Sequence, residues 1–271
     1  MKGYMSLSAL LRVCVIQAIL GGVWLAGIAQ AHDVWITFLP SLDGGFRAVI
    51  NHGHPGDRKA PDPDKLFELS VIGPDGRERQ VRPEGIPQML EGIPVLVTPL
   101  LDTKGETGTW LVAARYDNGY WVKTDYGHRN TSKLEFPAAT ESLHSVKFAK
   151  ALIFSRRPTS SASGRIIGHR LEIVPLDDPF AVSIGGRLQV RVMFEGRPLA
   201  GMGVEVSDGS TLKKETEIAR YFTNREGVAE IPIVRPGLQL LVVDYFAASP
   251  YPGLAEKDLL VATLSFDIAE K

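Results

Sequence analysis

The segment Leu188-Gln189-Val190-Arg191-Val192-Met193-Phe194 largely alternates apolar and polar side chains. Successive side chains of a β-strand point to opposite faces, so this pattern is typical of a half-buried antiparallel strand. A second segment, Thr109-Trp110-Leu111-Val112-Ala113-Ala114, is apolar on both faces. That pattern is expected of a strand at the centre of a sandwich, covered on both sides. Together the two segments predict a packed β-protein.

Short runs of the same kind continue on both sides of these segments, separated by Gly, Pro, Asn and Asp. We expect strands over 34–38, 46–51, 67–72, 95–99, 109–116, 120–124, 171–175, 187–194, 204–207, 219–223, 228–233, 238–245 and 259–266. Residues 142–154 suit either a helix or a long strand, and we favour a strand. The predicted fold class is therefore all-β, with two antiparallel β-sandwich domains of the Ig-like or transthyretin-like kind.

The first 31 residues have the features of a secretory signal peptide. Lys2 and Arg12 are followed by an apolar run over 13–27 and by Ala29-Gln30-Ala31, a small-residue cleavage site. We expect a cut after Ala31, which leaves a mature chain of 240 residues (271 − 31) without a membrane span. The Ser-rich segment 156–164 is the expected linker. It would separate an N-terminal β-sandwich domain, 32–155, from a C-terminal one, 165–271.

The composition excludes several classes of protein. The only cysteine, Cys14, lies in the expected signal peptide, so the mature chain has no disulfide, thiolate metal site or cysteine nucleophile. Without Lys2 and Arg12 the chain carries 28 basic and 31 acidic residues, a net charge of −3. No basic field is present to attract nucleic acid. The expected compartment is a bacterial periplasm.

Histidines provide the most specific chemical signal. After the expected cut, His32 would carry a free α-amine and an imidazole, two nitrogens that can bind one ion. His52 and His54 are two residues apart, which on a strand places both imidazoles on one face. The strand that follows His32 is expected to pair with the strand that leads to His52. His128, in a loop after another strand, is the fourth predicted ligand of a metal centre.

The predicted metal is a divalent transition ion, nickel or cobalt first and copper or zinc next, because neutral imidazole favours these ions. Asp33, Asp57 and Asp125 are the expected acceptors that orient the imidazoles. The alternative for His52 and His54 is a solvated strand end with no ligand role. His144 and His169 are expected to be structural. The aromatic residues of the expected strands are interpreted as buried sandwich residues, with Tyr120 and Trp121 partly exposed.

Seven stretches together resemble a known family. They are HDVW at 32–35, GHPGD at 53–57, GYWVKT at 119–124, KFAKAL at 147–152, GHRLEIVPLDDP at 168–179, EGRPLAG at 195–201 and TNREG at 223–227. The chain resembles the DUF4198 family, also described as a periplasmic component of cobalt and nickel uptake systems. The similarity covers nearly the whole mature chain. His32 and His54 lie in the family-like stretches, whereas His52 and His128 do not clearly do so.

The resemblance implies a secreted β-rich protein that binds nickel or cobalt and passes it to a membrane transporter of the energy-coupling-factor type. The stretches at 195–201 and 223–227 are similar to carboxypeptidase-regulatory-like modules, which are usually non-catalytic. The function predicted first is therefore periplasmic metal binding without enzyme activity. The first alternative is an envelope binding or adhesion module made of two Ig-like domains. The second is a copper-dependent oxidative enzyme, since a histidine brace supports oxygen chemistry.

Overall fold

The computed structural model describes residues 32–42, 44–103, 105–155, 163–214 and 217–270, and it confirms the all-β prediction. The expected signal peptide, 1–31, and residues 156–162 of the expected linker lie outside the described residues. The elements are β1 (Asp33–Pro40), β2 (Phe46–His54), β3 (Asp57–Lys59), η1 (Pro63–Lys65), β4 (Leu66–Ile72), β5 (Glu78–Gln80), β6 (Gln88–Leu90), β7 (Ile93–Val97), β8 (Gly108–Thr124), β9 (Gly127–Arg129), β10 (Glu141–Ser155), β11 (Leu171–Pro175), η2 (Pro179–Ala181), β12 (Arg187–Phe194), β13 (Arg197–Pro198), β14 (Gly203–Ser207), β15 (Ala219–Phe222), β16 (Val228–Pro232), β17 (Gly237–Ala248) and β18 (Lys257–Ile268).

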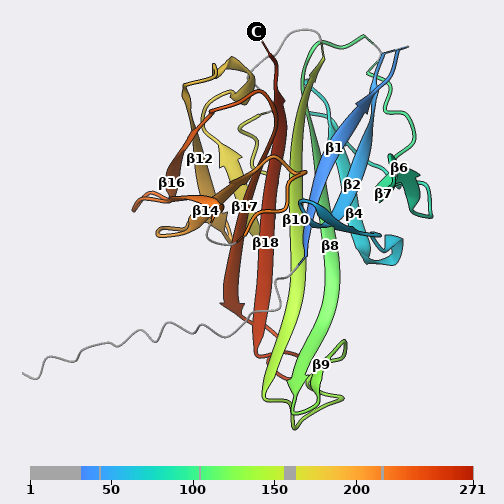
Figure 1. The fold of residues 1–271 in the computed structure, drawn as a ribbon, viewed down its shortest axis with the longest axis vertical. Helices are drawn as coiled ribbons and strands as arrows, with labels where there is room; N and C mark the ends of the chain where they lie inside the picture. Colours follow the sequence, from blue (N-terminus) through green and yellow to red (C-terminus); the bar gives the residue numbers. More distant parts are fainter. Residues whose placement is uncertain (1–31, 43, 104, 156–162, 215–216, 271) are drawn as a thin grey trace, which may run out of the picture. The chain divides into compact units, whose positions relative to one another are not determined.

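A nine-stranded sheet forms the middle of the fold. Its strand order is β15-β14-β17-β18-β10-β8-β4-β5, with β9 paired to β8. Figure 1 shows its longest strands, β8, β10, β17 and β18, running side by side between the two smaller sheets. The first small sheet has the order β1-β2-β7-β6, with β3 paired to β2. The second has the order β11-β12-β13, with β16 paired to β12.

Each face of the central sheet carries its own apolar core. One core joins Val34 and Ile36 of β1 to Ala149 and Ala151 of β10. The other joins Phe148 and further residues of β10 to the strands of the second small sheet. Neighbouring residues of β10 therefore pack into different cores, as the two-residue period of a strand requires. The fold has three layers, and the central one is buried on both faces.

The doubly apolar segment 109–114 lies in this central sheet. Trp110, Val112 and Ala114 pack into the core beneath β1 and β2. Leu111 and Ala113, which alternate with them, pack into the core on the other face. Burial on both sides therefore explains the absence of a polar face.

The structure confirms one expectation about strand extent and corrects another. Residues 142–154 do form a strand, since β10 covers them within Glu141–Ser155. The expected strands 109–116 and 120–124 instead form one continuous strand, β8. A register shift opposite Ser145 and Val146 absorbs the extra residue. Gly119 supplies a left-handed φ of 81°, and its N–H donates to the Asp117 side chain at 2.9 Å.

Both halves of the chain contribute to the central sheet. β10, the last strand before the expected linker, pairs with β18 in parallel. The other strand pairs of the described residues are antiparallel, as expected from the sequence. The division into domains 32–155 and 165–271 stays a prediction. Within the described residues, no helix is long and apolar enough to cross a membrane.

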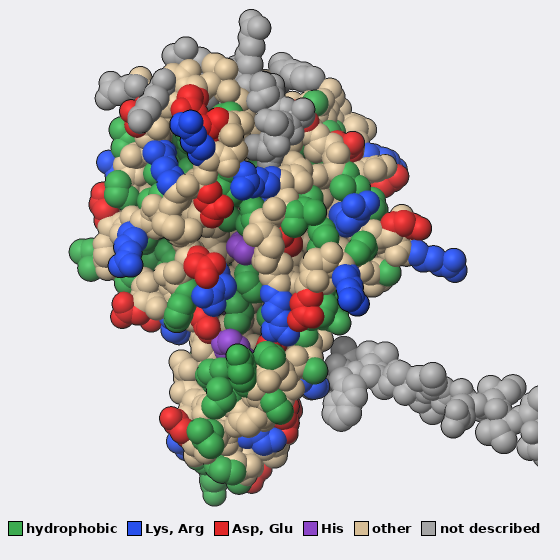
Figure 2. All heavy atoms as spheres, turned by 180° about the vertical axis from the view of Figure 1, so that it is seen from behind, with side chains coloured by type: hydrophobic (Ala, Val, Ile, Leu, Met, Phe, Trp, Pro, Cys, Tyr) green, Lys and Arg blue, Asp and Glu red, His purple; other side chains and the backbone are tan. Residues whose placement is uncertain are grey.

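Charge is evenly mixed on the face seen in Figure 2. Lys and Arg side chains alternate there with Asp and Glu, and hydrophobic side chains lie between them. Among the described residues of this face, neither sign of charge forms a wide patch. A field of that kind would not steer a highly charged partner to this face.

Candidate metal centre

Pairing of β1 with β2 brings three histidines together. Asp33 lies opposite Gly53 and Val34 lies opposite His52. The same register continued by one residue places His32, just before β1, opposite His54. The His32 ring centroid is 5.2 Å from that of His52 and 5.2 Å from that of His54. Of the four predicted ligands, His32, His52 and His54 therefore lie in one cluster, which we call the histidine cluster.

The turn after His54 fixes the position of this cluster. β2 folds back onto β3, with His54 opposite Asp57. Gly53 has a φ of 119°, and a Cβ atom there would lie 2.4 Å from the Asp57 carbonyl oxygen. Only glycine permits so close a backbone approach. Arg58 of β3 lies over the Trp35 ring at 4.4 Å and ties β3 to β1.

The His52 imidazole is buried and lacks good polar partners. Its exposed fraction is 8%, and neither ring nitrogen makes a hydrogen bond of normal geometry with a described residue. Burial lowers the pKa of His52 to about 4, and His32 lowers it further, while the Ala60 backbone partly offsets this. A buried polar atom without a partner costs free energy and is rare in native proteins. At least one of the two nitrogens is therefore available to a ligand.

His32 and His54 are more accessible. Burial lowers the pKa of His32, with smaller contributions from His54 and Lys59. The His54 Nδ1 atom lies 3.9 Å from an Asp33 carboxylate oxygen. A carboxylate at that place orients an imidazole and raises its basicity as a ligand. Asp33 is thus near His54 but beyond hydrogen-bond distance, so its expected orienting role stays a prediction, whereas Asp57 pairs with Lys59 at 2.8 Å.

The ring spacing in the cluster suits shared coordination of one ion. A metal–nitrogen bond of about 2.0–2.1 Å puts a ring centroid about 3.2 Å from the metal, so two tetrahedral imidazole ligands have centroids about 5.2 Å apart. Both separations are compatible with that value, which also falls within the range of ordinary ring contacts, such as the 5.2 Å between Phe38 and Phe46. As the side chains stand, no group of three or more His, Cys, Asp or Glu among the described residues is arranged to hold an ion. The rings must therefore rotate before their nitrogens converge.

Two further residues of the central sheet face the cluster, and neither was predicted from the sequence as a site residue. The Tyr116 ring centroid lies 5.3 Å from that of His52, and its hydroxyl accepts a hydrogen bond from the Asp62 N–H at 3.0 Å. Lys147 lies opposite Tyr116 in the neighbouring strand and is 1% exposed. It lies close enough to lower the pKa values of His32 and His52. The sequence feature that could have identified Lys147 is a lysine at the start of the largely apolar stretch KFAKAL, residues 147–152.

His128 does not join the cluster. It is exposed in β9 and lies opposite Lys123. Lys123 is seven residues further along β8 than Tyr116, a separation of roughly 20 Å at the rise of a strand. Asp125 is exposed in the turn between β8 and β9, at the same end as His128. Because β8 is one long strand, the turn that carries these two residues is far from His52.

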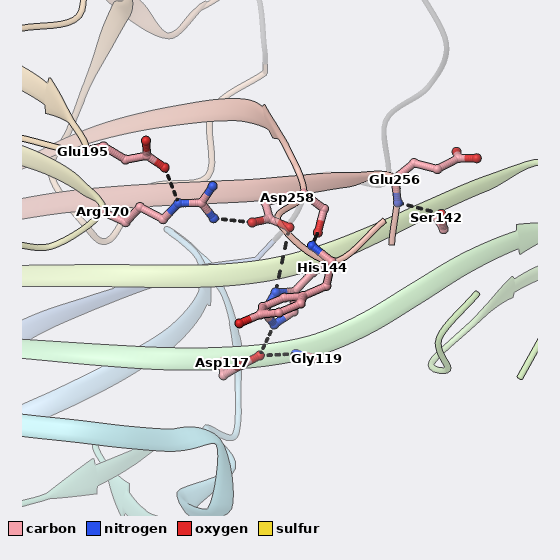
Figure 3. Close-up of polar contacts among 10 residues, drawn as sticks. Asp117, Gly119, Ser142, His144, Arg170, Glu195, Glu256 and Asp258 are labelled. Carbon is pink, nitrogen blue, oxygen red and sulfur yellow. Dashed lines mark hydrogen bonds and ion pairs between the residues drawn. The ribbon is translucent and has the colours of Figure 1, made fainter. Parts of the chain in front are cut away.

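His144 belongs to a different polar network, drawn in Figure 3. Its Nε2 atom lies 2.9 Å from Asp117, and its Nδ1 atom lies 3.9 Å from the buried carboxylate of Asp258. Arg170 pairs with Asp258 and with Glu195, the latter at 3.0 Å. This network of charged groups connects β8, β10 and β18 to the segment before β11 and so stabilises the fold.

His169 lies outside this network. It packs against Phe148, and burial lowers its pKa to about 4.

The chain matches one protein-family model and is similar to several solved structures. A family model described as "Domain of unknown function (DUF4198)" matches residues 29–246. No curated protein matches the chain. Similar solved structures include the FN1–FN3 domains of chicken CNTN1, with 12% identity over 89% of this chain and 69% of that chain and a TM-score of 0.21. The D0–D1 domain of Intimin has 14% identity over 86% and 97%, with a TM-score of 0.20. The BSP domain of a biofilm associated protein has 10% identity over 89% and 52%, with a TM-score of 0.19.

Proposed function

The chain belongs to the DUF4198 family, and we propose that it binds a divalent transition metal through His32, His52 and His54. The observation that supports this most is the pair of 5.2 Å separations between the His32 ring and the other two rings. The unpartnered nitrogens of His52 add to it, because an ion would satisfy one of them. Nickel and cobalt are the proposed ions in the cell, with copper and zinc also accommodated.

The nitrogen donor atoms of the proposed site limit which metal ions it would bind well. Three neutral imidazoles form a borderline site without thiolate, which suits nickel, cobalt, copper and zinc better than calcium or magnesium. If the chain is cut after Ala31, the His32 α-amine supplies a fourth nitrogen. Its reference pKa of about 7.7–8.0 means that an ion displaces the proton easily near neutral pH. His128 takes no part in this proposed site.

The proposed role is binding and delivery, without turnover of a substrate. A protein of this kind in the periplasm would pass its ion to a membrane transporter. His32 precedes β1 and is only half-buried, so it can release an ion without unfolding the sandwich. Oxidation of an added reductant by the copper-loaded protein would instead favour the copper-dependent enzyme named above.

The test is titration of nickel, cobalt and copper into protein purified from its export compartment, with the N-terminus determined by mass spectrometry. We expect 1:1 binding, weakened at least about tenfold by His52→Ala and by His32→Ala. His128→Ala is the matched control and should leave the affinity unchanged. Equal affinities in the His52 and His128 variants would refute the proposed ligand set. If a residue added before His32 leaves the metal affinity unchanged, the α-amine is not a ligand, but the imidazole ligands remain possible.

A further inference from the structure

An unpartnered buried cation lies next to the histidine cluster. Lys147 of β10 lies between Tyr116 of β8 and Val261 of β18 in the central sheet. Ala149 and Ala151, on the same face of β10, pack into the core beneath β1. The Lys147 side chain therefore points to the layer that holds β1 and β2, at the end where His32 and His52 lie.

A second buried lysine shows how this fold treats an ordinary buried charge. Lys150 is also 1% exposed, but its Nζ atom donates to Glu172 at 2.7 Å and to the Arg165 carbonyl at 3.0 Å. The Lys147 Nζ atom has no hydrogen-bond partner among the described residues. Buried charges in proteins are normally paired, because an isolated ammonium in an apolar interior is costly. Unlike Lys150, Lys147 is therefore a buried cation whose hydrogen-bonding capacity is unused, so a bound anion would stabilise it.

The groups that face Lys147 do not pair with it directly. Burial lowers the pKa of Lys147 to about 8, while Asp33 and Asp244 raise it. Among the described residues neither carboxylate lies within the 4 Å of an ion pair with its ammonium group. His32 and His52 are the neutral groups on the same side. The ammonium thus remains largely protonated at neutral pH, with two carboxylates near but not in contact.

A metal ion at the histidine cluster would create a problem of charge. Three imidazoles neutralise none of its two positive charges, and the Lys147 ammonium would repel it in a buried environment, where the Asp33 carboxylate offsets only part of the total charge. An anion between the two cations turns this repulsion into two attractions. A carboxylate offers one oxygen to an ion and another to an ammonium.

We propose that Lys147 and the histidine cluster together form a two-part site, which takes a divalent metal ion along with a small monoanionic carboxylate. The imidazoles hold the metal, and the Lys147 ammonium holds the second carboxylate oxygen. This deepens the function proposed above and rests on it. The ligand of the protein would then be a metal–carboxylate complex, so its metal affinity would depend on the anions present.

The experiment uses copper(II), which binds nitrogen sites most tightly, with azide as a coloured monoanion and acetate as its competitor. In the wild type, azide should bind the copper-loaded protein and acetate should displace it. Lys147→Met should weaken azide and acetate at least about tenfold, while copper in anion-free buffer binds equally or more tightly. A purely structural role of Lys147 would not weaken anion binding while leaving the copper affinity unchanged or higher.

Lys59→Met is the matched control, since Lys59 also acts on His32 but is exposed and paired with Asp57. Lys59→Met should leave the azide affinity at the wild-type value. Lys147→Arg should recover part of the azide affinity that Lys147→Met loses. Equal azide affinity in the wild type and in Lys147→Met would overturn the proposal. If no variant binds copper, the proposed histidine ligands fail, and acetate calorimetry on metal-free protein decides about Lys147. Acetate binding lost in Lys147→Met then supports the anion site, and no binding in the wild type overturns it.

Discussion

Replacing His52 by phenylalanine should remove a defined part of the acid sensitivity of the metal-free protein. The folded pKa of His52 is about 4, and the reference value for an unfolded chain is about 6.5. Protonation therefore favours the unfolded state, and stability falls as the pH drops from about 6.5 to about 4. Phenylalanine keeps a ring against Tyr116 but does not titrate.

The magnitude follows from the two pKa values. Between pH 7 and pH 4.5, a group with these values changes the free energy of unfolding by about 2 kcal/mol. The wild type should lose that amount more than His52→Phe over this interval. His169, whose folded pKa is also about 4, titrates in both proteins, so its share cancels in the difference. Carboxylates that titrate in this range cancel in the same way.

The assay is urea unfolding after removal of metal, at pH 7.0, 5.5 and 4.5, with the free energy extrapolated to water. His128→Phe serves as the control at an exposed position. Its stability should run parallel to that of the wild type across the pH range. If the His52→Phe curve is parallel as well, His52 is not held neutral by burial, and the description of the cluster as poorly solvated is wrong.

Three other substitutions test the framework around the site. Gly53→Ala should destabilise the protein by about 1–3 kcal/mol in urea unfolding and weaken copper binding, because of its φ of 119° and its close backbone contact. Glu172→Gln should lower the free energy of unfolding by about 3–5 kcal/mol, since it leaves the Lys150 charge buried without its partner. Thr263→Val removes the 2.8 Å hydrogen bond to the Val34 carbonyl and should cost about 1 kcal/mol. A cost in urea unfolding below about 0.3 kcal/mol would show that the carbonyl finds another partner.

The strands were predictable because a two-residue period is a local property. The alternation in 188–194 and the doubly apolar run 109–114 are direct consequences of burial on one face or on both. The pairing of the strand after His32 with the strand before His52 was also predictable, since consecutive strands commonly form a hairpin. That pairing is what brings the three histidines together.

The rest depended on information that no short segment contains. The parallel pairing of β10 with β18 joins residues more than 100 positions apart, and neither strand encodes its partner. His128 was expected in the site because 109–116 and 120–124 were interpreted as separate strands. In one continuous β8, the turn that carries His128 lies at the far end. Lys147 was noted only as part of the family-like stretch 147–152, because its burial becomes visible only when β1 covers β10.

Four strands change from apolar to polar or amphipathic residues at the same end of one core, and this coincidence is the strongest reason to regard that end as a site. The residues at this end are His32 before β1, His52 on β2 opposite Val34, Tyr116 on β8, and Lys147 on β10 opposite Tyr116. The next residues on the same faces are Val34, Ile50, Ala114 and Ala149, all members of one apolar core. A core selected for stability alone would continue the apolar pattern, because buried imidazole and ammonium groups without partners are costly. Such local conflicts with stability are expected where a protein binds a ligand. A ligand that satisfies both the His52 imidazole and the Lys147 ammonium would remove the conflict on β2 and β10 together, while the Tyr116 hydroxyl already accepts a hydrogen bond from the Asp62 N–H.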